Sequence, residues 1–322
     1  MLLLLKKGKG EIMNSEIFDF YDRASLKSYN LDKSMKYQLN MLDRLDAFTR
    51  KHSENVANLT CRLCQKLHLS KGFTEYCTIC AYLHDIGKLF IPPSVLQKPG
   101  KLTQEEYEIM KTHTTLGYNM CMSDLQLRPY SAGALYHHEA LNGTGYPQGL
   151  LKNEIPVEGQ IIRVADEFDA IVSKRQYKTH IGISDTLKIL IENTKPQKDM
   201  QPKNKYSSKY GKNNPLFVRK LIKIVIEDIE YEIFLTQSYL GDLKDNIKRL
   251  KQILKYKEAY EKAKKEKDKN YYYEGAKFLF KENENLENCE QVYNEYIQAL
   301  SIRKDKIANL YNEISIIKKL KV

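Results

Sequence analysis

The spacing of apolar residues predicts a chain that is helical almost throughout. Residues recur at intervals of three and four on one face of a helix predicted over 52–67: Val56, Thr60, Leu63, Cys64 and Leu67. A second helix is predicted over 73–84, with one face formed by Cys77, Cys80, Ala81 and His84. Alternation typical of strands is scarce, apart from brief apolar runs such as 160–165. We therefore predict an all-α protein.

A third helix is predicted to begin after a loop marked by Pro92-Pro93 and Pro99-Gly100. Thr103 and Glu106 have the spacing of a capping box, in which each side chain bonds a free backbone N–H of the other residue. We expect this helix to carry His113 about two and a half turns from its start.

The C-terminal part has a different periodicity, in which apolar spacings of three and four alternate. One stripe is formed by Leu240, Leu243, Ile247, Leu250 and Leu254. A second stripe is formed by Leu286, Cys289, Tyr293, Tyr296, Leu300, Arg303, Ile307, Leu310, Ile314 and Ile317, with Arg303 as its one charged member. This is the seam of a coiled coil. Two long helices in an antiparallel hairpin and a parallel dimer explain it equally well, with 262–273 as the connection.

These patterns divide the chain into three parts. Residues 1–45 form a helical N-terminal extension, 46–231 a helical domain, and 232–322 a helical coiled-coil extension. The segment 195–213 is rich in Lys, Pro and Ser, so it is predicted to be a flexible insertion or loop. The C-terminal helices could bind a second copy of the chain or a partner protein, or could simply pack on each other.

Composition narrows the class of protein only slightly. The 322 residues carry a net charge of +11, which attracts polyanions in general. Much of this charge lies in short lysine runs that water can solvate, so nucleic acid is not favoured as a partner. No stretch approaches the roughly 20 apolar residues that span a bilayer. The apolar start at 1–5 is too short for a signal sequence. We expect a cytoplasmic protein.

The six cysteines are expected to be free thiols in that compartment. Cys61 and Cys64 have a spacing seen in zinc sites, as do Cys77 and Cys80. Both pairs fall on apolar helix faces, whereas zinc ribbons usually place such pairs on turns. We favour buried thiols over structural zinc.

The strongest chemical signal is a concentration of metal-ligating residues. Five of the seven histidines and two aspartates form the candidate set: His52, His84, Asp85, His113, His137, His138 and Asp166. Imidazole suits first-row transition metals, and a carboxylate can bridge two of them. His52, His84, Asp85 and Asp166 could hold one ion. Asp85, His113, His137 and His138 could hold the other.

Two such ions suit hydrolysis of a phosphoester. They can activate a water molecule and neutralise the charge on phosphate oxygens. Because the set contains nitrogen and oxygen donors and no thiolate, two divalent transition metal ions are expected, and this chemistry favours Mn, Fe, Zn or Ni without choosing among them. Our prediction is Fe or Mn, with Zn or Ni as alternatives.

The motifs around these residues resemble an HD-GYP domain. His84-Asp85-Ile86-Gly87-Lys88 is similar to the first half of that domain. His137-His138-Glu139 followed by Gly143-Thr144-Gly145-Tyr146-Pro147 is similar to its second half. The likeness covers about 50–193 and includes the segment 164–170. It implies an HD-superfamily helical bundle that hydrolyses cyclic di-GMP. It also implies a bacterial source. The product would be linear pGpG, with GMP if a second cut follows.

The resemblance also implies roles for further residues. Asp85 and Lys88 would be catalytic, with Lys88 stabilising charge at the scissile phosphate. Lys88, Tyr146, Arg175 and Lys178 would contact the substrate, Arg175 and Lys178 through its phosphates or a guanine. Gly143 and Gly145 would let the loop before Tyr146 turn tightly.

Departures from the family pattern bear on metal count and ligand contacts. Some members place a Glu four residues before the first histidine and hold a third metal. Phe48 occupies that position here, so two metals are expected. Ala140-Leu141-Asn142 replaces a common Arg-Trp-Asp and alters a stretch that contacts ligand in the family. The altered stretch keeps open a non-catalytic cyclic di-GMP receptor signalling through its helical tail. An HD phosphohydrolase of another nucleotide is a further alternative, which the Gly-Tyr-Pro loop disfavours.

Overall fold

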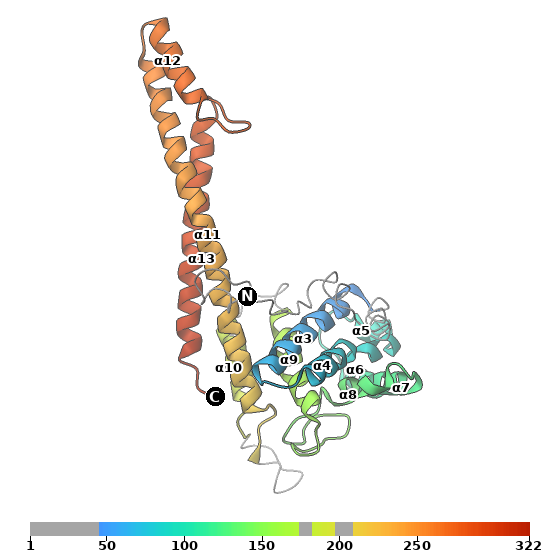
Figure 1. Cartoon of the computed structure of the whole chain (residues 1–322). Coiled ribbons are helices and arrows are strands. Elements are labelled where there is room, and N and C mark those ends of the chain that lie inside the picture. The colour runs from blue at the N-terminus through green and yellow to red at the C-terminus, as the bar shows by residue number, and fades with distance from the viewer. Residues whose placement is uncertain (1–44, 174–181, 197–208) are drawn as a thin grey trace. The chain divides into compact units, whose positions relative to one another are not determined.

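The computed structural model of the protein describes residues 45–173, 182–196 and 209–322 (Figure 1). The secondary structure of this part of the chain is helical, with turns and loops between the helices. Its only β pairing is an isolated antiparallel bridge between Asn142 and Leu151. The prediction of an all-α protein is confirmed. The described residues form two compact units: residues up to Val225 together with 319–322, and Ile226–Lys318. The predicted boundary at 231/232 stays a prediction, and the predicted extension over 1–44 lies outside the described residues.

The first unit is built from short helices. They are α3 (Ala47–Lys66), α4 (Lys71–Leu83), η3 (Ile86–Phe90), α5 (Pro93–Leu96), α6 (Gln104–Lys111), α7 (His113–Ser123), η4 (Arg128–Tyr130), α8 (Ser131–Tyr136), α9 (Val157–Ser173) and α10 (Ile183–Glu192). The helix α11 (Pro215–Lys262) begins in this unit and continues into the second. No helix in the described ranges is both long enough and apolar enough to cross a bilayer.

The core of this unit lies where α3 packs against α4 and α9 (Figure 1). The predicted faces meet there: Val56, Leu63 and Cys64 of α3 are fully buried, as are Cys77 and Cys80 of α4. The cysteines are therefore core residues, and burial raises the pKa of Cys80. No disulfide forms among the six cysteines, all of which lie in described segments. The apolar run at 160–165 forms the middle of α9 and is no strand.

The capping box at Thr103 and Glu106 is confirmed at the start of α6. The continuation of this helix through His113 is wrong, because α6 ends at Lys111 and a new helix starts at His113. Side chains explain the break. The Thr112 hydroxyl donates to the Ile109 carbonyl at 2.6 Å, and His113 Nδ1 donates to the Met110 carbonyl at 2.7 Å. These side chains take carbonyls that a continuous helix would bond through backbone N–H groups.

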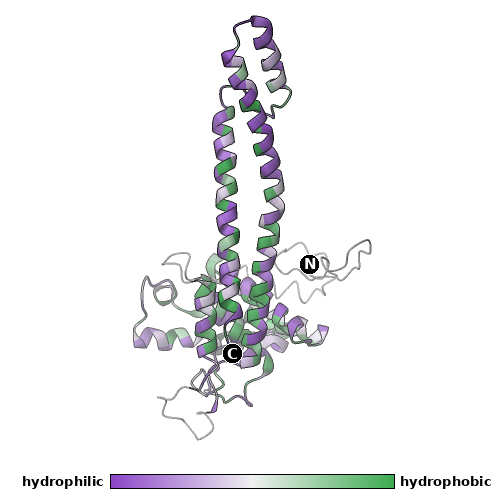
Figure 2. Ribbon diagram, turned by 90° about the vertical axis from the view of Figure 1, so that its left-hand side faces the viewer, coloured by the Kyte–Doolittle hydropathy of each residue, from purple (hydrophilic) through white to green (hydrophobic). Residues whose placement is uncertain are grey.

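The second unit is an antiparallel helical hairpin. The remainder of α11 pairs with α13 (Cys289–Lys318), and both views show the two helices side by side (Figures 1 and 2). Cross-contacts run in opposite directions along the chain: Gln237 bonds Tyr311, whereas Lys257 lies 4.0 Å from Glu290. Every predicted seam residue of both stripes is buried or half-buried. Within this unit the hairpin explains the periodicity, and binding of a second copy or a partner stays a prediction.

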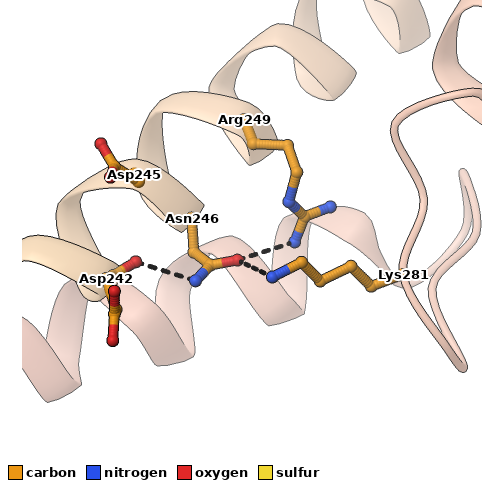
Figure 3. A pocket seen from close by; sticks show the side chains of 5 residues that line it. All are labelled: Asp242, Asp245, Asn246, Arg249 and Lys281. Carbon is orange, nitrogen blue, oxygen red and sulfur yellow. Dashed lines mark hydrogen bonds between the residues drawn. The ribbon is translucent and has the colours of Figure 1, made fainter. Parts of the chain in front are cut away.

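The connection between the two long helices differs from the prediction. Residues 266–277 form α12 (Glu266–Lys277), where a linker was expected. This helix is stable because Ala276 packs into a small core with Leu250, Ile253 and Cys289. An open pocket beside this core is lined by Asp242, Asp245, Asn246, Arg249 and Lys281 (Figure 3).

The predicted insertion is anchored at its C-terminal end. Lys212 N and Asn213 N both donate to the Asn193 carbonyl, at 2.7 and 2.9 Å, and Lys212 O accepts from Leu141 N at 3.0 Å. Asn213 is buried and its amide donates to Glu167 of α9 at 2.6 Å. This end is therefore not a loose loop, and residues 197–208 lie outside the described part of the chain.

Candidate metal centre

Two groups of metal-ligating side chains face each other in the first unit. One comprises His52, His84 and Asp85, and the other His113, His137 and His138. Within each group, one ligand atom per residue lies within 4.8 Å of the others. They come from α3, the junction of α4 and η3, the start of α7, and the segment after α8. Residues up to 86 positions apart in the sequence are thus brought together.

Asp85 directs its two carboxylate oxygens to different groups. Oδ2 lies 3.3 Å from His84 Nε2 and 3.7 Å from His52 Nε2. Oδ1 lies 3.5 Å from His113 Nε2 and 4.0 Å from His137 Nε2. One carboxylate can therefore contact cations on both sides.

Asp166 of α9 completes the first group. Its Oδ1 lies 3.0 Å from His52 Nε2 and 4.0 Å from His84 Nε2. Its Oδ2 lies 3.9 Å from Nδ1 of His138, so this carboxylate also reaches towards the second group. Burial acts to raise the pKa of Asp166, but the hydrogen bond from His52 and nearby imidazoles lower it. Asp166 is thus a carboxylate, the form that binds metal.

Backbone carbonyls orient three of the imidazoles. His84 Nδ1 lies 2.6 Å from Ala81 O, His113 Nδ1 2.7 Å from Met110 O, and His137 Nδ1 2.9 Å from Gly133 O. A carbonyl only accepts, so each Nδ1 carries the proton and Nε2 presents a lone pair to the site. The Nε2 atom of His84 is buried and has no hydrogen-bond partner in the described part of the chain. Such an atom needs a ligand, and a metal ion fits this donor set.

His52 is oriented by a carboxylate instead. Its Nδ1 lies 2.7 Å from Oδ2 of Asp169, whose Oδ1 accepts from Asn55 at 3.0 Å. Burial alone would lower the pKa of His52, but hydrogen bonds to Asp166 and Asp169 raise it to about 10. Sequence reasoning assigned no role to Asp169. Its position one helical turn after Asp166 was the available signal.

The second group is electrostatically different. Burial lowers the pKa of His113 and holds that of His137 well below its usual value. Burial also lowers the pKa of His138 to about 3. These imidazoles are therefore neutral at pH 7, which is the form that binds a metal ion.

Lys88 lies beside the first group. Its Nζ donates to Asp85 Oδ2 at 2.5 Å from the short helix η3. Burial acts to lower the pKa of Lys88, but the adjacent Asp85 carboxylate raises it, so the side chain is an ammonium. The family resemblance implied that Lys88 faces the scissile phosphate, which stays a prediction. In the structure its ammonium donates a hydrogen bond to Asp85.

Tyr146 covers the second group. Its ring stacks on His138 with centroids 4.6 Å apart and lies 6.4 Å from the His113 ring. The Tyr146–Pro147 peptide bond is cis. Gly143 has φ +76°, as a tight turn requires, whereas Gly145 serves close approach because a Cβ there would lie 2.4 Å from His138 O.

Glu139 anchors the loop that follows Tyr146. The buried carboxylate accepts from the backbone N–H groups of Gln148 at 2.7 Å, Gly149 at 3.2 Å and Leu150 at 2.8 Å. The sequence contained it within His137-His138-Glu139 but indicated no function for it. Its signal was an acidic residue inside a segment that is otherwise buried.

The remaining predicted site residues have different outcomes. Arg175 and Lys178 lie outside the described residues. Phe48, in the first turn of α3, is 59% exposed. Ala140, Leu141 and Asn142 are buried, so none of these three side chains offers an exposed contact surface.

Comparison with known proteins identifies the family. The family model described as HD domain matches residues 36–201. A cyclic di-GMP phosphodiesterase from Thermotoga maritima is 47% identical over 143 residues, which cover 44% of this chain and 39% of that protein. The chain belongs to the HD domain family, in the HD-GYP group whose motifs it carries.

Two further relatives have related names. The cyclic di-GMP phosphodiesterase response regulator RpfG from Xanthomonas campestris is 43% identical over 136 residues, covering 41% of this chain and 36% of that protein. A 3'3'-cGAMP-specific phosphodiesterase 3 from Vibrio cholerae is 36% identical over 155 residues, covering 48% and 33%. The matched segment thus spans well under half of each of these relatives.

Proposed function

We propose that this protein is a metal-dependent phosphodiesterase that opens cyclic di-GMP to linear pGpG. The observation that carries the proposal is Asp85, whose two oxygens face two separate groups of imidazoles. Two divalent ions, Fe or Mn, would be held there. One would take His52, His84, Asp85 and Asp166, and the other Asp85, His113, His137 and His138. When bound, such ions polarise a phosphate and lower the pKa of a coordinated water.

The count of two metals rests on the donors available. Asp166 supplies the second carboxylate beside Asp85, and both are surrounded by imidazole nitrogens. Besides Asp169, whose carboxylate is engaged by His52 Nδ1 and Asn55, a third ion would need another acidic donor near His52. Phe48, four residues before it, offers an apolar ring. The available donor side chains therefore fit two metals.

The chain's own residues would orient the substrate. The Lys88 ammonium lies against Asp85 and can interact with a phosphate oxygen as negative charge develops there. Tyr146, stacked on His138, forms a rigid wall for the nucleotide. Glu139 holds the backbone of 148–150 and so fixes the loop that carries this wall.

Cyclic di-GMP is the proposed substrate because of the matching relatives. The Thermotoga and Xanthomonas proteins carry it in their names, and they are 47% identical over 143 residues and 43% identical over 136 residues. The Vibrio relative, named for cGAMP, makes other cyclic dinucleotides the natural comparison substrates.

The test is hydrolysis by purified protein loaded with Mn²⁺ or Fe²⁺ under reducing, anaerobic conditions. Cyclic di-GMP should be converted to pGpG, and chromatography resolves that product from GMP. Asp85→Ala should lose bound metal and turnover together, because both groups share this carboxylate. Metal-loaded protein that binds cyclic di-GMP but yields no linear product would instead identify a receptor. Full activity of Asp85→Ala would refute the bridging role.

A further inference from the structure

The helix α6 places two side chains against the Tyr146 loop without contributing to the core. None of the eight side chains of α6, which is described in full, is buried. Tyr107 and Lys111 are one turn apart on the same face of this helix. Core packing therefore does not account for their position.

These two side chains form one cluster with Tyr146. Lys111 Nζ lies 5.4 Å from the ring centroid of Tyr107 and 5.9 Å from that of Tyr146. The two rings are 6.5 Å apart and nearly perpendicular. Because Tyr146 also stacks on His138, the cluster is continuous with the second metal-ligating group. A cation is thus held over aromatic faces at the edge of the site.

The cluster is accessible to a ligand. Tyr107 is 44% exposed and the Lys111 side chain 27%. Lys111 Nζ also pairs with Glu108 Oε2 at 2.6 Å, but the Glu108 side chain is 55% exposed. An ion pair this exposed is weak, so a phosphate can replace the carboxylate. Aromatic faces bordering a cation suit a nucleotide, because a base stacks on the ring while its phosphate meets the charge.

We propose that Tyr107 and Lys111 bind the half of the cyclic dinucleotide that is not cut. Lys111 contacts the second phosphate, the one that is not cut. Tyr107 and Tyr146 border the purine of the same nucleotide. This inference rests on the proposed function and assigns the part of the substrate that lies beyond the metals. The two residues determine affinity for a dinucleotide and do not act on the scissile bond.

The test compares two substrates that share one reacting group. Bis(p-nitrophenyl) phosphate has a single phosphodiester and no second nucleotide, whereas cyclic di-GMP has both. Lys111→Met should raise KM for cyclic di-GMP by roughly tenfold or more, as loss of a charged hydrogen bond does. Metal content and turnover of bis(p-nitrophenyl) phosphate should stay unchanged. Lys111→Arg should retain most of the affinity, and Tyr107→Leu should raise KM as well.

Two further variants give opposite or neutral outcomes. Glu108→Gln frees the lysine and should lower KM for cyclic di-GMP. Lys188→Met removes the lysine of the exposed Lys188–Asp185 pair on α10, which has the same three-residue spacing as Lys111 and Glu108. It should leave KM and turnover unchanged for both substrates. Equal losses on both substrates in Lys111→Met, or no loss on either, would overturn the proposal. Wild-type protein that cleaves only bis(p-nitrophenyl) phosphate would instead overturn the proposed function, and this inference with it.

Discussion

His52 and Asp169 are 117 residues apart in the sequence and are joined by a 2.7 Å hydrogen bond between Nδ1 and Oδ2. This bond directs Nε2 of His52 towards Asp166 and Asp85. The other buried imidazoles use backbone carbonyls for the same purpose. A carboxylate partner makes the ring a stronger donor to a metal ion, and it can be altered by mutation without moving the backbone.

Asp169→Asn should therefore weaken metal binding at the group that contains His52. A loss of metal affinity of about 10–100-fold is expected for such a partner. Metal content after dialysis against graded chelator measures it without any reference to activity. Asp185→Asn removes an exposed carboxylate on α10 and serves as the control. Unchanged metal retention in Asp169→Asn would show that His52 needs no orienting partner.

Gly87→Ala should disrupt the contact between η3 and α7. A Cβ at Gly87 would lie 1.9 Å from the His113 carbonyl oxygen and 2.5 Å from Gly117 N, so the backbone must move. Overpacking of this kind typically costs about 1–3 kcal/mol. Because the contact sets Asp85 against His113, metal content should fall too.

Gly241→Ala is the matched control for that substitution. Gly241 lies in α11, and a Cβ there would meet no atom within 4 Å. Alanine should stabilise the helix by about 0.5–1 kcal/mol. Urea unfolding followed by circular dichroism measures both changes, and a Gly87→Ala protein as stable as wild type would contradict the close-approach argument.

Glu139→Gln should loosen the loop over 148–150. The amide nitrogen of Gln cannot accept, so at least one of three backbone N–H groups loses its partner, at about 1–3 kcal/mol. Faster hydrogen exchange in the peptide covering this loop is the expected result. Glu154→Gln, which affects a single exposed contact with Leu151 N, should have a smaller effect. Equal exchange in the two variants would argue against Glu139 as the anchor.

The tip of the hairpin should lose stability in acid. A hydrogen bond from Arg249 lowers the pKa of Glu284, and Arg249 also donates to the Leu279 carbonyl at 2.7 Å. Since the folded pKa lies below the unfolded value of about 4.3, this stabilisation is present above pH 4.3 and is lost as pH falls through the folded pKa.

Hydrogen exchange across α12, corrected for the intrinsic pH dependence, measures this loss. Protection should drop on going from pH 5 to below pH 4 in wild type. Glu284→Gln should show a lower and flatter profile, because it lacks the titrating group. Identical profiles for the two proteins would mean that the pair with Arg249 does not stabilise the tip.

Local features were readable from the sequence alone. The capping box at Thr103 depends only on residues three apart, and the buried faces of α3 and α4 follow from helical periodicity. Both seams of the hairpin were predicted residue by residue, since burial repeats with the helix. Periodicity does not show whether the two helices run parallel or antiparallel, however. Only contacts between them, such as that of Lys306 with Glu232, establish an antiparallel pair.

Helix ends set by side chains were not predictable in the same way. The pattern over 104–113 is that of one helix, and the break at Thr112 arises because two side chains compete for backbone carbonyls. Similarly, α12 exists because Ala276 finds a core contributed by residues distant in sequence. Intrinsic helix propensities describe single residues and do not include such tertiary contacts.

The sequence by itself determined which residue types this protein has available: five clustered histidines, the His84-Asp85 pair and the Gly-Tyr-Pro loop. Their chemistry is intrinsic to the side chains, so order along the chain sufficed to propose a metal site. Tertiary structure alone decided which oxygen of Asp85 faces which group, that Asp169 orients His52, and that Glu139 holds the loop. These are relationships of distance and direction across packed helices, and hydrogen bonds that depend on angstrom-scale geometry leave no periodic trace in a sequence.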